Sequence, residues 1–382
     1  MQFALTETQQ TLKNTVRKFL AAECPMSEVR RLLETETAHD PGLWAKMAEQ
    51  GWTGIIFPEA YGGFGMGMVE MAAALEEMGR ALLPGPYLST ITAGALLEHA
   101  ASDAQKHEHL SAICHGDAKA TVALLEQAAS WSPDAVTMGA ALIGSRYQLH
   151  GQKLFVNDAA VADFIICAAR LDGDLALLLA PKGRFKATAM PAMDGTRKLY
   201  EVSFESLPPE CLLARGARAH RALERALDIG AIALVSEMVG GMQRLLDMTV
   251  EYAKTRKQFG KPIGSFQAVQ QQCADMLLFT ESSRSATYYG AWALQEGTHE
   301  AQSAVSTAKA YASEAYREVG NRAIQVHGGM GFTWENDCHL YYRRAKASEI
   351  AFGDATYHRE RIARMVVDRQ RVRVEDGVAA VV

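Results

Sequence analysis

Two short stretches carry the residues of this sequence that are best suited to holding a phosphate-bearing ligand. In the first, Arg256 offers a forked, permanently charged donor that matches the oxygens of a pyrophosphate, and Phe259 adds a flat apolar face nearby. In the second, Gly328 and Gly329 remove side chains where a backbone must approach a ligand closely. Either stretch alone is most simply a glycine-requiring turn or a surface arginine. Their occurrence together favours a ligand site.

The elements that must position these residues are predicted from periodicity. A capping box at Thr6 and Gln9 opens a helical region, and helical spacing recurs over 41–50 and 68–82. Short β-branched and aromatic runs follow, including 147–156, 164–169 and 175–179. Four long helical stretches complete the chain, over 217–255, 266–295, 300–327 and 341–369.

The predicted fold is therefore mostly α with a central β domain. Long helices bury their apolar stripes against one another, which favours a bundle. These helices have more apolar surface than one bundle needs, so we expect a dimer or a tetramer. The predicted divisions are an N-terminal helical domain over 1–118, a β-barrel or sandwich over 119–215, a C-terminal four-helix bundle over 216–370 and a loose tail over 371–382.

Composition argues against several other functions. Six cysteines are scattered singly with no Cys-x-x-Cys pair, so we expect reduced thiols and no metal site. A net charge of −5 without a basic run predicts neither nucleic-acid nor membrane binding. No secretory signal is recognisable, and the most apolar helical stretch, 229–242, is short and contains Glu237. We expect a cytoplasmic protein with that stretch as a core helix.

Two motifs resemble signatures of the acyl-CoA dehydrogenase family. The sequence YAKTRKQFGKPIGSFQAVQ over 252–270 is similar to its helix-turn-helix signature, and QVHGGMGFTWE over 325–335 is similar to its second signature. The resemblance implies FAD as the cofactor. In the family these motifs reach the FAD of a neighbouring subunit, and the matching residues here are Arg256, Phe259, Gln267, Gln325, Gly328 and Gly329.

The resemblance also extends to residues nearer the chain's own flavin and substrate. The run from Tyr147 to Asp158 resembles the family's strand beside the flavin, where Asn157 can still donate a hydrogen bond and Ser130 remains available. Asp228 falls in a segment that helps to hold the acyl-CoA, although Ala231 replaces the family's Arg. A solvated helix carboxylate is an equal alternative for Asp228.

The chain departs from the family at the catalytic base. Most members place a Glu where this sequence has Phe352, and a minority place it where this sequence has Gly230. Asp354, two residues from the usual position, could substitute, but Asp before a helix is the ordinary N-cap choice and the cap is preferred. Leu125 and Phe155 likewise replace a Thr and a Trp on the chain's own flavin side.

The predicted function is acyl-CoA dehydrogenation, by the chain alone or as the flavin-completing subunit of a heteromeric α2β2 enzyme. The resemblance implies an acyl-CoA substrate, an electron-transfer partner such as an electron-transfer flavoprotein, and a homo- or hetero-oligomer. Two alternatives remain open: a flavin oxidase or monooxygenase on the same fold, and a non-catalytic assembly subunit.

Overall fold

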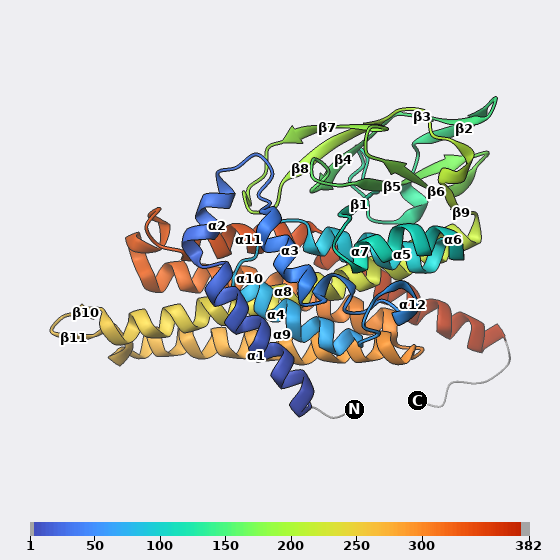
Figure 1. Ribbon diagram of the computed structural model, residues 1–382. Helices are drawn as coiled ribbons and strands as arrows, with labels where there is room; N and C mark the ends of the chain where they lie inside the picture. The colour runs from blue at the N-terminus through green and yellow to red at the C-terminus, as the bar shows by residue number, and fades with distance from the viewer. Residues whose placement is uncertain (1–3, 376–382) are drawn as a thin grey trace.

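The computed structural model describes residues 4–375 and shows a helical, β, helical order (Figure 1). The N-terminal region begins with the predicted capping box, in which the Thr6 hydroxyl accepts from the Gln9 amide at 3.3 Å and Gln9 Oε1 accepts from the Thr6 amide at 2.9 Å. Its helices are α1 (Glu7–Glu23), α2 (Met26–Leu33), α3 (Pro41–Glu49), α4 (Met68–Arg80), α5 (Tyr87–Ala100), α6 (Asp103–Gln105) and α7 (Ser111–Cys114).

The middle region contains two sheets that share an apolar core. One sheet has the order β3-β2-β5-β6-β9, with β1 parallel to β5, and the other has the order β4-β8-β7. Ile165 of the first sheet and Val156 and Val202 of the second belong to one buried cluster. The strands are β1 (Ala120–Ala123), β2 (Gly139–Ile143), β3 (Arg146–His150), β4 (Gln152–Asn157), β5 (Phe164–Leu171), β6 (Asp174–Pro181), β7 (Phe185–Met190), β8 (Leu199–Phe204) and β9 (Leu212–Arg215).

The C-terminal region is a helical bundle built around one long helix. This helix, α8, packs against α9 and α10 and also against α4 and α5. Among the described residues it is the one helix apolar enough to cross a membrane, but 89% of its apolar window is buried, which confirms the predicted core helix. The elements are α8 (Ala217–Thr255), β10 (Lys257–Gln258), β11 (Lys261–Pro262), α9 (Gln267–Glu296), α10 (Ala301–His327), α11 (Cys338–Ile350) and α12 (Ala355–Glu375).

The fold class is thus confirmed, but the end of the chain differs from the prediction. The helix expected over 341–369 is divided into α11 and α12, because Phe352 and Gly353 have φ angles of 57° and 94° that no right-handed helix contains. The predicted loose tail was wrong for residues 371–375, which continue α12. Residues 376–382 of that tail lie outside the described residues.

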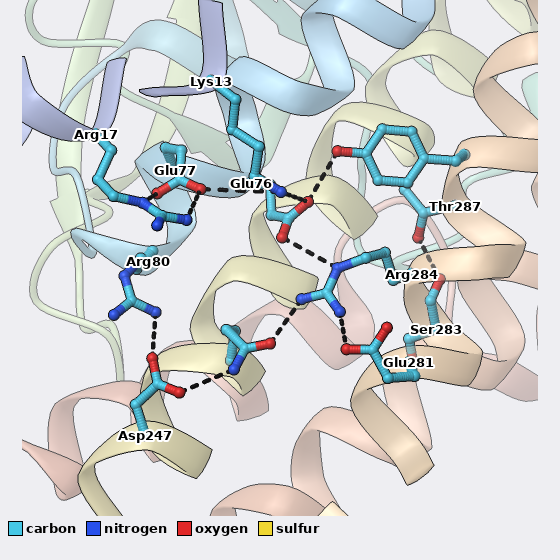
Figure 2. Close-up of polar contacts among 12 residues, drawn as sticks. Lys13, Arg17, Glu76, Glu77, Arg80, Asp247, Glu281, Ser283, Arg284 and Thr287 are labelled. Atoms are coloured by element: carbon cyan, nitrogen blue, oxygen red, sulfur yellow. Dashed lines mark hydrogen bonds and ion pairs between the residues drawn. The ribbon is translucent and has the colours of Figure 1, made fainter. Parts of the chain in front are cut away.

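Buried carboxylates join the N-terminal helices to the bundle, as Figure 2 shows. On α4, Glu76 accepts from Lys13 of α1 at 2.7 Å and from Arg284 of α9 at 3.2 Å. The adjacent Glu77 accepts two hydrogen bonds from Arg17, each of 2.7 Å. Burial opposes the ionisation of Glu76, but its cationic partners hold its pKa below the ordinary value. The network therefore holds both α1 and α9 against α4.

The crossing of α4 and α8 requires small residues. A Cβ added at Gly240 would overlap the Glu76 carbonyl oxygen and lie 2.6 Å from the Arg80 backbone nitrogen. We expect Gly240→Ala to force the helices apart and to cost roughly 3 kcal/mol of folding free energy. Thermal unfolding measures the effect, with Gly139→Ala as the control because a Cβ there meets nothing within 4 Å. Equal melting temperatures for both variants would contradict this account of the crossing.

Candidate functional site

The hairpin after α8 presents the predicted pyrophosphate ligands to solvent. Lys257 and Gln258 of β10 pair with Pro262 and Lys261 of β11, and the two residues of the turn, Phe259 and Gly260, have φ angles of 52° and 79°. Two consecutive positive φ angles are typical of the tight turns that join hairpin strands. The ring of Phe259 is 91% exposed, and Arg256 at the base of the hairpin is also exposed.

The second motif lies beside the first in space. The ring of Tyr252, near the end of α8, stacks on His327, the last residue of α10, with a centroid distance of 4.4 Å. Gly328 follows with φ 60° and ψ −142°, a conformation that only glycine adopts readily. The structure thus brings together two motifs that are far apart in the sequence.

Gly329 leaves its backbone open to an external ligand. Its φ angle is not positive, and a Cβ at this position would meet nothing of its own chain within 4 Å. The position is therefore open to close approach by another molecule. The residues present fit the phosphate-bearing part of FAD. All six predicted ligands from the two motifs are exposed: Arg256, Phe259, Gln267, Gln325, Gly328 and Gly329.

The ligands predicted for the chain's own flavin lie elsewhere. Asn157 ends β4 and pairs with Leu199 of β8, and Ser130 Oγ accepts from the Ser132 amide at 3.3 Å. Both belong to the β region, whereas the β10–β11 hairpin projects from the far end of the bundle (Figure 1). The structure does not bring these two groups together within one chain. This separation is what a cofactor shared between chains requires.

The strand that resembles the family's flavin-side strand is irregular. The predicted run 147–156 is two strands separated at Gly151, and β4 has a register shift between Lys153 and Val156. The shift leaves Phe155 at φ 55° and 39% exposed. Fully buried Lys153 donates to Glu126 at 2.6 Å. Burial alone would raise the pKa of Glu126, but the hydrogen bonds from Lys153 and Thr137 lower it to about 2.

The two positions at which the family resemblance expects a base meet in the structure. A Cβ on Gly230 of α8 would lie 2.8 Å from Phe352 Cζ, nearer still to Phe352 Cε1, and 2.9 Å from Thr92 Oγ1. The Phe352 ring, 8% exposed, stacks on Trp131 with a centroid distance of 5.0 Å and an angle of 26°. Sequence reasoning missed Trp131, because nothing local indicates that its loop touches the loop before α12.

The two candidate carboxylates have structural partners. Asp354 is exposed and caps α12, since its Oδ1 accepts from the Tyr357 amide at 2.8 Å, as the preferred interpretation predicted. Asp228 is buried, so the interpretation of it as a solvated carboxylate was wrong. Both of its oxygens accept from Arg361 of α12, one of them at 3.0 Å. Within residues 4–375, no group of three or more His, Cys, Asp or Glu side chains gathers as a metal site would require.

The sequence was compared with family models and with known proteins, and the matches name the family that the two motifs resemble. Residues 6–117 match the model of the acyl-CoA dehydrogenase N-terminal domain, and residues 219–367 match that of the C-terminal domain. Two relatives from Mycobacterium tuberculosis are each 32% identical: the acyl-CoA dehydrogenase IpdE2, over 90% of this chain and 92% of its own length, and the acyl-CoA dehydrogenase FadE27, over 96% and 99%.

The solved ChsE4–ChsE5 complex from the same organism superposes with a TM-score of 0.87 at 30% identity, covering 96% of this chain and 99% of the matched chain. The fold and the site thus define an FAD-dependent oxidoreductase. The chain belongs to the acyl-CoA dehydrogenase family, whose reaction is the α,β-dehydrogenation of acyl-CoA thioesters.

Proposed function

We propose that this chain is the flavin-completing subunit of a heteromeric acyl-CoA dehydrogenase. Its hairpin and the end of α10 hold the FAD of a related partner chain, and the partner supplies the catalytic base. The observation that carries the proposal is the contact of Phe352 with Gly230, which fills both family positions for the base with groups that cannot accept a proton. The exposed ligands on the hairpin and at Gly329, in contrast, are complete.

The chemistry explains why this asymmetry favours two different chains. The α-carbon of a thioester is a weak acid, so removal of its proton needs a positioned carboxylate and stabilisation of the carbonyl oxygen. FAD, when bound, would supply the hydride acceptor for the β-hydrogen. A chain that keeps ligands for a neighbour's FAD but lacks the base is useful where the neighbour has the base. The ChsE4–ChsE5 structure, a complex of two chains, supports such an arrangement here.

Each remaining site residue has a proposed role in this scheme. Asn157 and Ser130 are retained as hydrogen-bonding groups on this chain's own flavin side. Asp228 acts on the substrate side indirectly, by holding the guanidinium of Arg361. Asp354 serves as the helix cap and not as a base. The substrate is an acyl-CoA, the electron acceptor is an electron-transfer flavoprotein, and the complex is cytoplasmic.

The absorption spectrum of the purified protein tests the proposal. The chain alone is expected to contain little flavin, and co-expression with a related chain that keeps the base is expected to give a complex that retains FAD. Flavin at full occupancy in the lone chain, together with acyl-CoA turnover, would show a self-sufficient enzyme. Full flavin occupancy without turnover would favour the oxidase or assembly alternatives.

Replacing Arg256 by Lys tests the contact in trans. Lysine keeps the charge but loses the planar fork, so one of two charge-assisted hydrogen bonds disappears, at a cost of about 1.5–3 kcal/mol. FAD affinity of the co-purified complex should fall tenfold or more, as followed by flavin fluorescence during dilution. Arg364→Lys is the matched control, because Arg364 is an exposed arginine that pairs with Glu360 on its own helix. An unchanged affinity would mean that Arg256 is structural.

A further inference from the structure

The loop between α11 and α12 is held from beneath by a buried lysine. Lys309 of α10 is fully buried, and its Nζ donates to the carbonyl oxygens of Gly353 at 2.7 Å and Glu349 at 3.1 Å and to Ser313 Oγ at 2.8 Å. Burial lowers the pKa of Lys309 to about 7, against the opposing attraction of Asp354 and Glu349. A fully buried lysine is rare unless it is paired. Here all three of its donor positions are used, two on the carbonyl oxygens of Glu349 and Gly353 and one on the Ser313 hydroxyl of α10.

A buried histidine fixes the next carbonyl of the same loop. His358 Nε2 lies 2.9 Å from the Phe352 carbonyl oxygen, and burial lowers the pKa of His358 to about 3. The neutral ring therefore donates through Nε2. Its other nitrogen, Nδ1, is buried without a hydrogen-bond partner among the described residues.

The loop is held in a backbone conformation that costs free energy. Phe352 has φ 57°, which for a bulky residue costs on the order of 1–3 kcal/mol and persists only where surrounding contacts over-determine it. Gly353 follows with φ 94°, and a Cβ there would lie 2.9 Å from Tyr357 Cε1. This backbone conformation places the Phe352 ring against Gly230 of α8.

The ring is covered from the other side by the β region. Trp131 stacks on Phe352, and its indole Nε1 donates to the Ile350 carbonyl oxygen at 3.1 Å. The order in space is therefore Trp131, the Phe352 ring and Gly230, with Thr92 beside them. An acyl α-carbon beside Gly230 would need about 3.5–4.0 Å from each neighbouring atom. The Phe352 ring already occupies that space.

We propose that the stacked Trp131 and Phe352 form a stopper that excludes acyl thioesters from this chain's own acyl site. Lys309 and His358 are its positioning residues. The inference rests on the proposed function, because family resemblance assigns the space beside Gly230 to the acyl group. Its consequence is that the heteromer binds one acyl-CoA for each pair of chains, at the partner's site only.

A simple packing role for the two aromatic rings predicts something different. If the rings only fill a core, their removal lowers stability and creates no affinity for a ligand. If they form a stopper, their removal opens a site that an acyl-CoA can enter. Gain of binding therefore separates the two roles, whatever the loss of stability.

The test is calorimetric titration of the full chain with octanoyl-CoA, accompanied by thermal unfolding with and without the ligand. The wild-type chain is expected to give no binding heat. The double variant Trp131→Ala, Phe352→Ala is expected to bind up to one octanoyl-CoA per chain. Its melting temperature is expected to rise when octanoyl-CoA is present. Phe352→Tyr should not bind octanoyl-CoA, because it keeps an aromatic ring in the acyl site. Lys309→Met should bind weakly, because the loop loses its anchor while both rings remain.

The matched control is Trp292→Ala, which removes an indole from another stacked aromatic pair, with Tyr289 on α9. This control variant should not bind octanoyl-CoA. If the double variant does not fold, Phe352→Ala alone still tests the stopper, because this ring is the one that occupies the space beside Gly230. Stoichiometric binding by the wild type, or no binding by any folded variant, would overturn the proposal. Binding by an inactive wild-type chain would leave the proposed function intact, whereas full flavin with turnover in the lone chain would overturn that function.

Discussion

Replacing Phe352 by Glu, in an FAD-loaded complex whose partner chain has lost its own base, is expected to raise acyl-CoA turnover at this chain's own site by about 10² to 10⁴, the usual contribution of a positioned base. The substitution removes the ring from the space beside Gly230 and places a carboxylate there. Phe352→Gln is the matched control, since it opens the same space with a side chain of similar size that is not a base. Reduction of an artificial electron acceptor by octanoyl-CoA measures both variants.

Substitutions at the other two candidate positions for the base, Asp354 and Gly230, provide a comparison. Asp354→Asn is expected to leave turnover unchanged, because its side chain still accepts at the helix cap. Gly230→Glu alone is expected to be inactive, since its side chain would collide with Phe352, and a carboxylate at position 230 needs the ring removed as well, as in the pair Gly230→Glu and Phe352→Ala. Robust wild-type turnover at this site that survives Asp354→Asn would show that another residue carries the chemistry.

Glu76→Ala is expected to give the largest loss of stability. The substitution leaves Lys13 and Arg284 without their buried anion, and the Tyr288 hydroxyl loses an acceptor at 2.9 Å. Breaking a buried ion pair by removing one partner typically costs about 3–5 kcal/mol. Thermal unfolding should show a melting temperature lower by on the order of 10 °C.

Glu281→Ala separates burial from charge in the same network (Figure 2). Glu281 also pairs with Arg284, but its side chain is 51% exposed, and exposed pairs contribute only about 0–1 kcal/mol. We expect its removal to change the melting temperature little. Comparable losses for Glu76→Ala and Glu281→Ala would show that the network is not a buried constraint on α1 and α9.

Much of the fold could be predicted from the sequence because its signals are local. Helical periodicity located α8, α9 and α10 to within one or two residues, and the Thr6–Gln9 capping box marked the start of α1. These features depend on side chains three or four residues apart, which the sequence shows directly. The break at Phe352 and Gly353 was missed in the helix pattern, because contacts from Lys309 and His358 impose it.

The sequence by itself determined the family and the cofactor, because the motifs around Arg256 and Gly329 are contiguous and specific. The tertiary structure alone decided what the unusual residues do. It placed Phe352 on Gly230, covered it with Trp131 and paired Asp228 with Arg361. Each of these contacts joins residues more than one hundred positions apart. Their geometry follows from how whole helices and sheets pack, which no local pattern of side chains records.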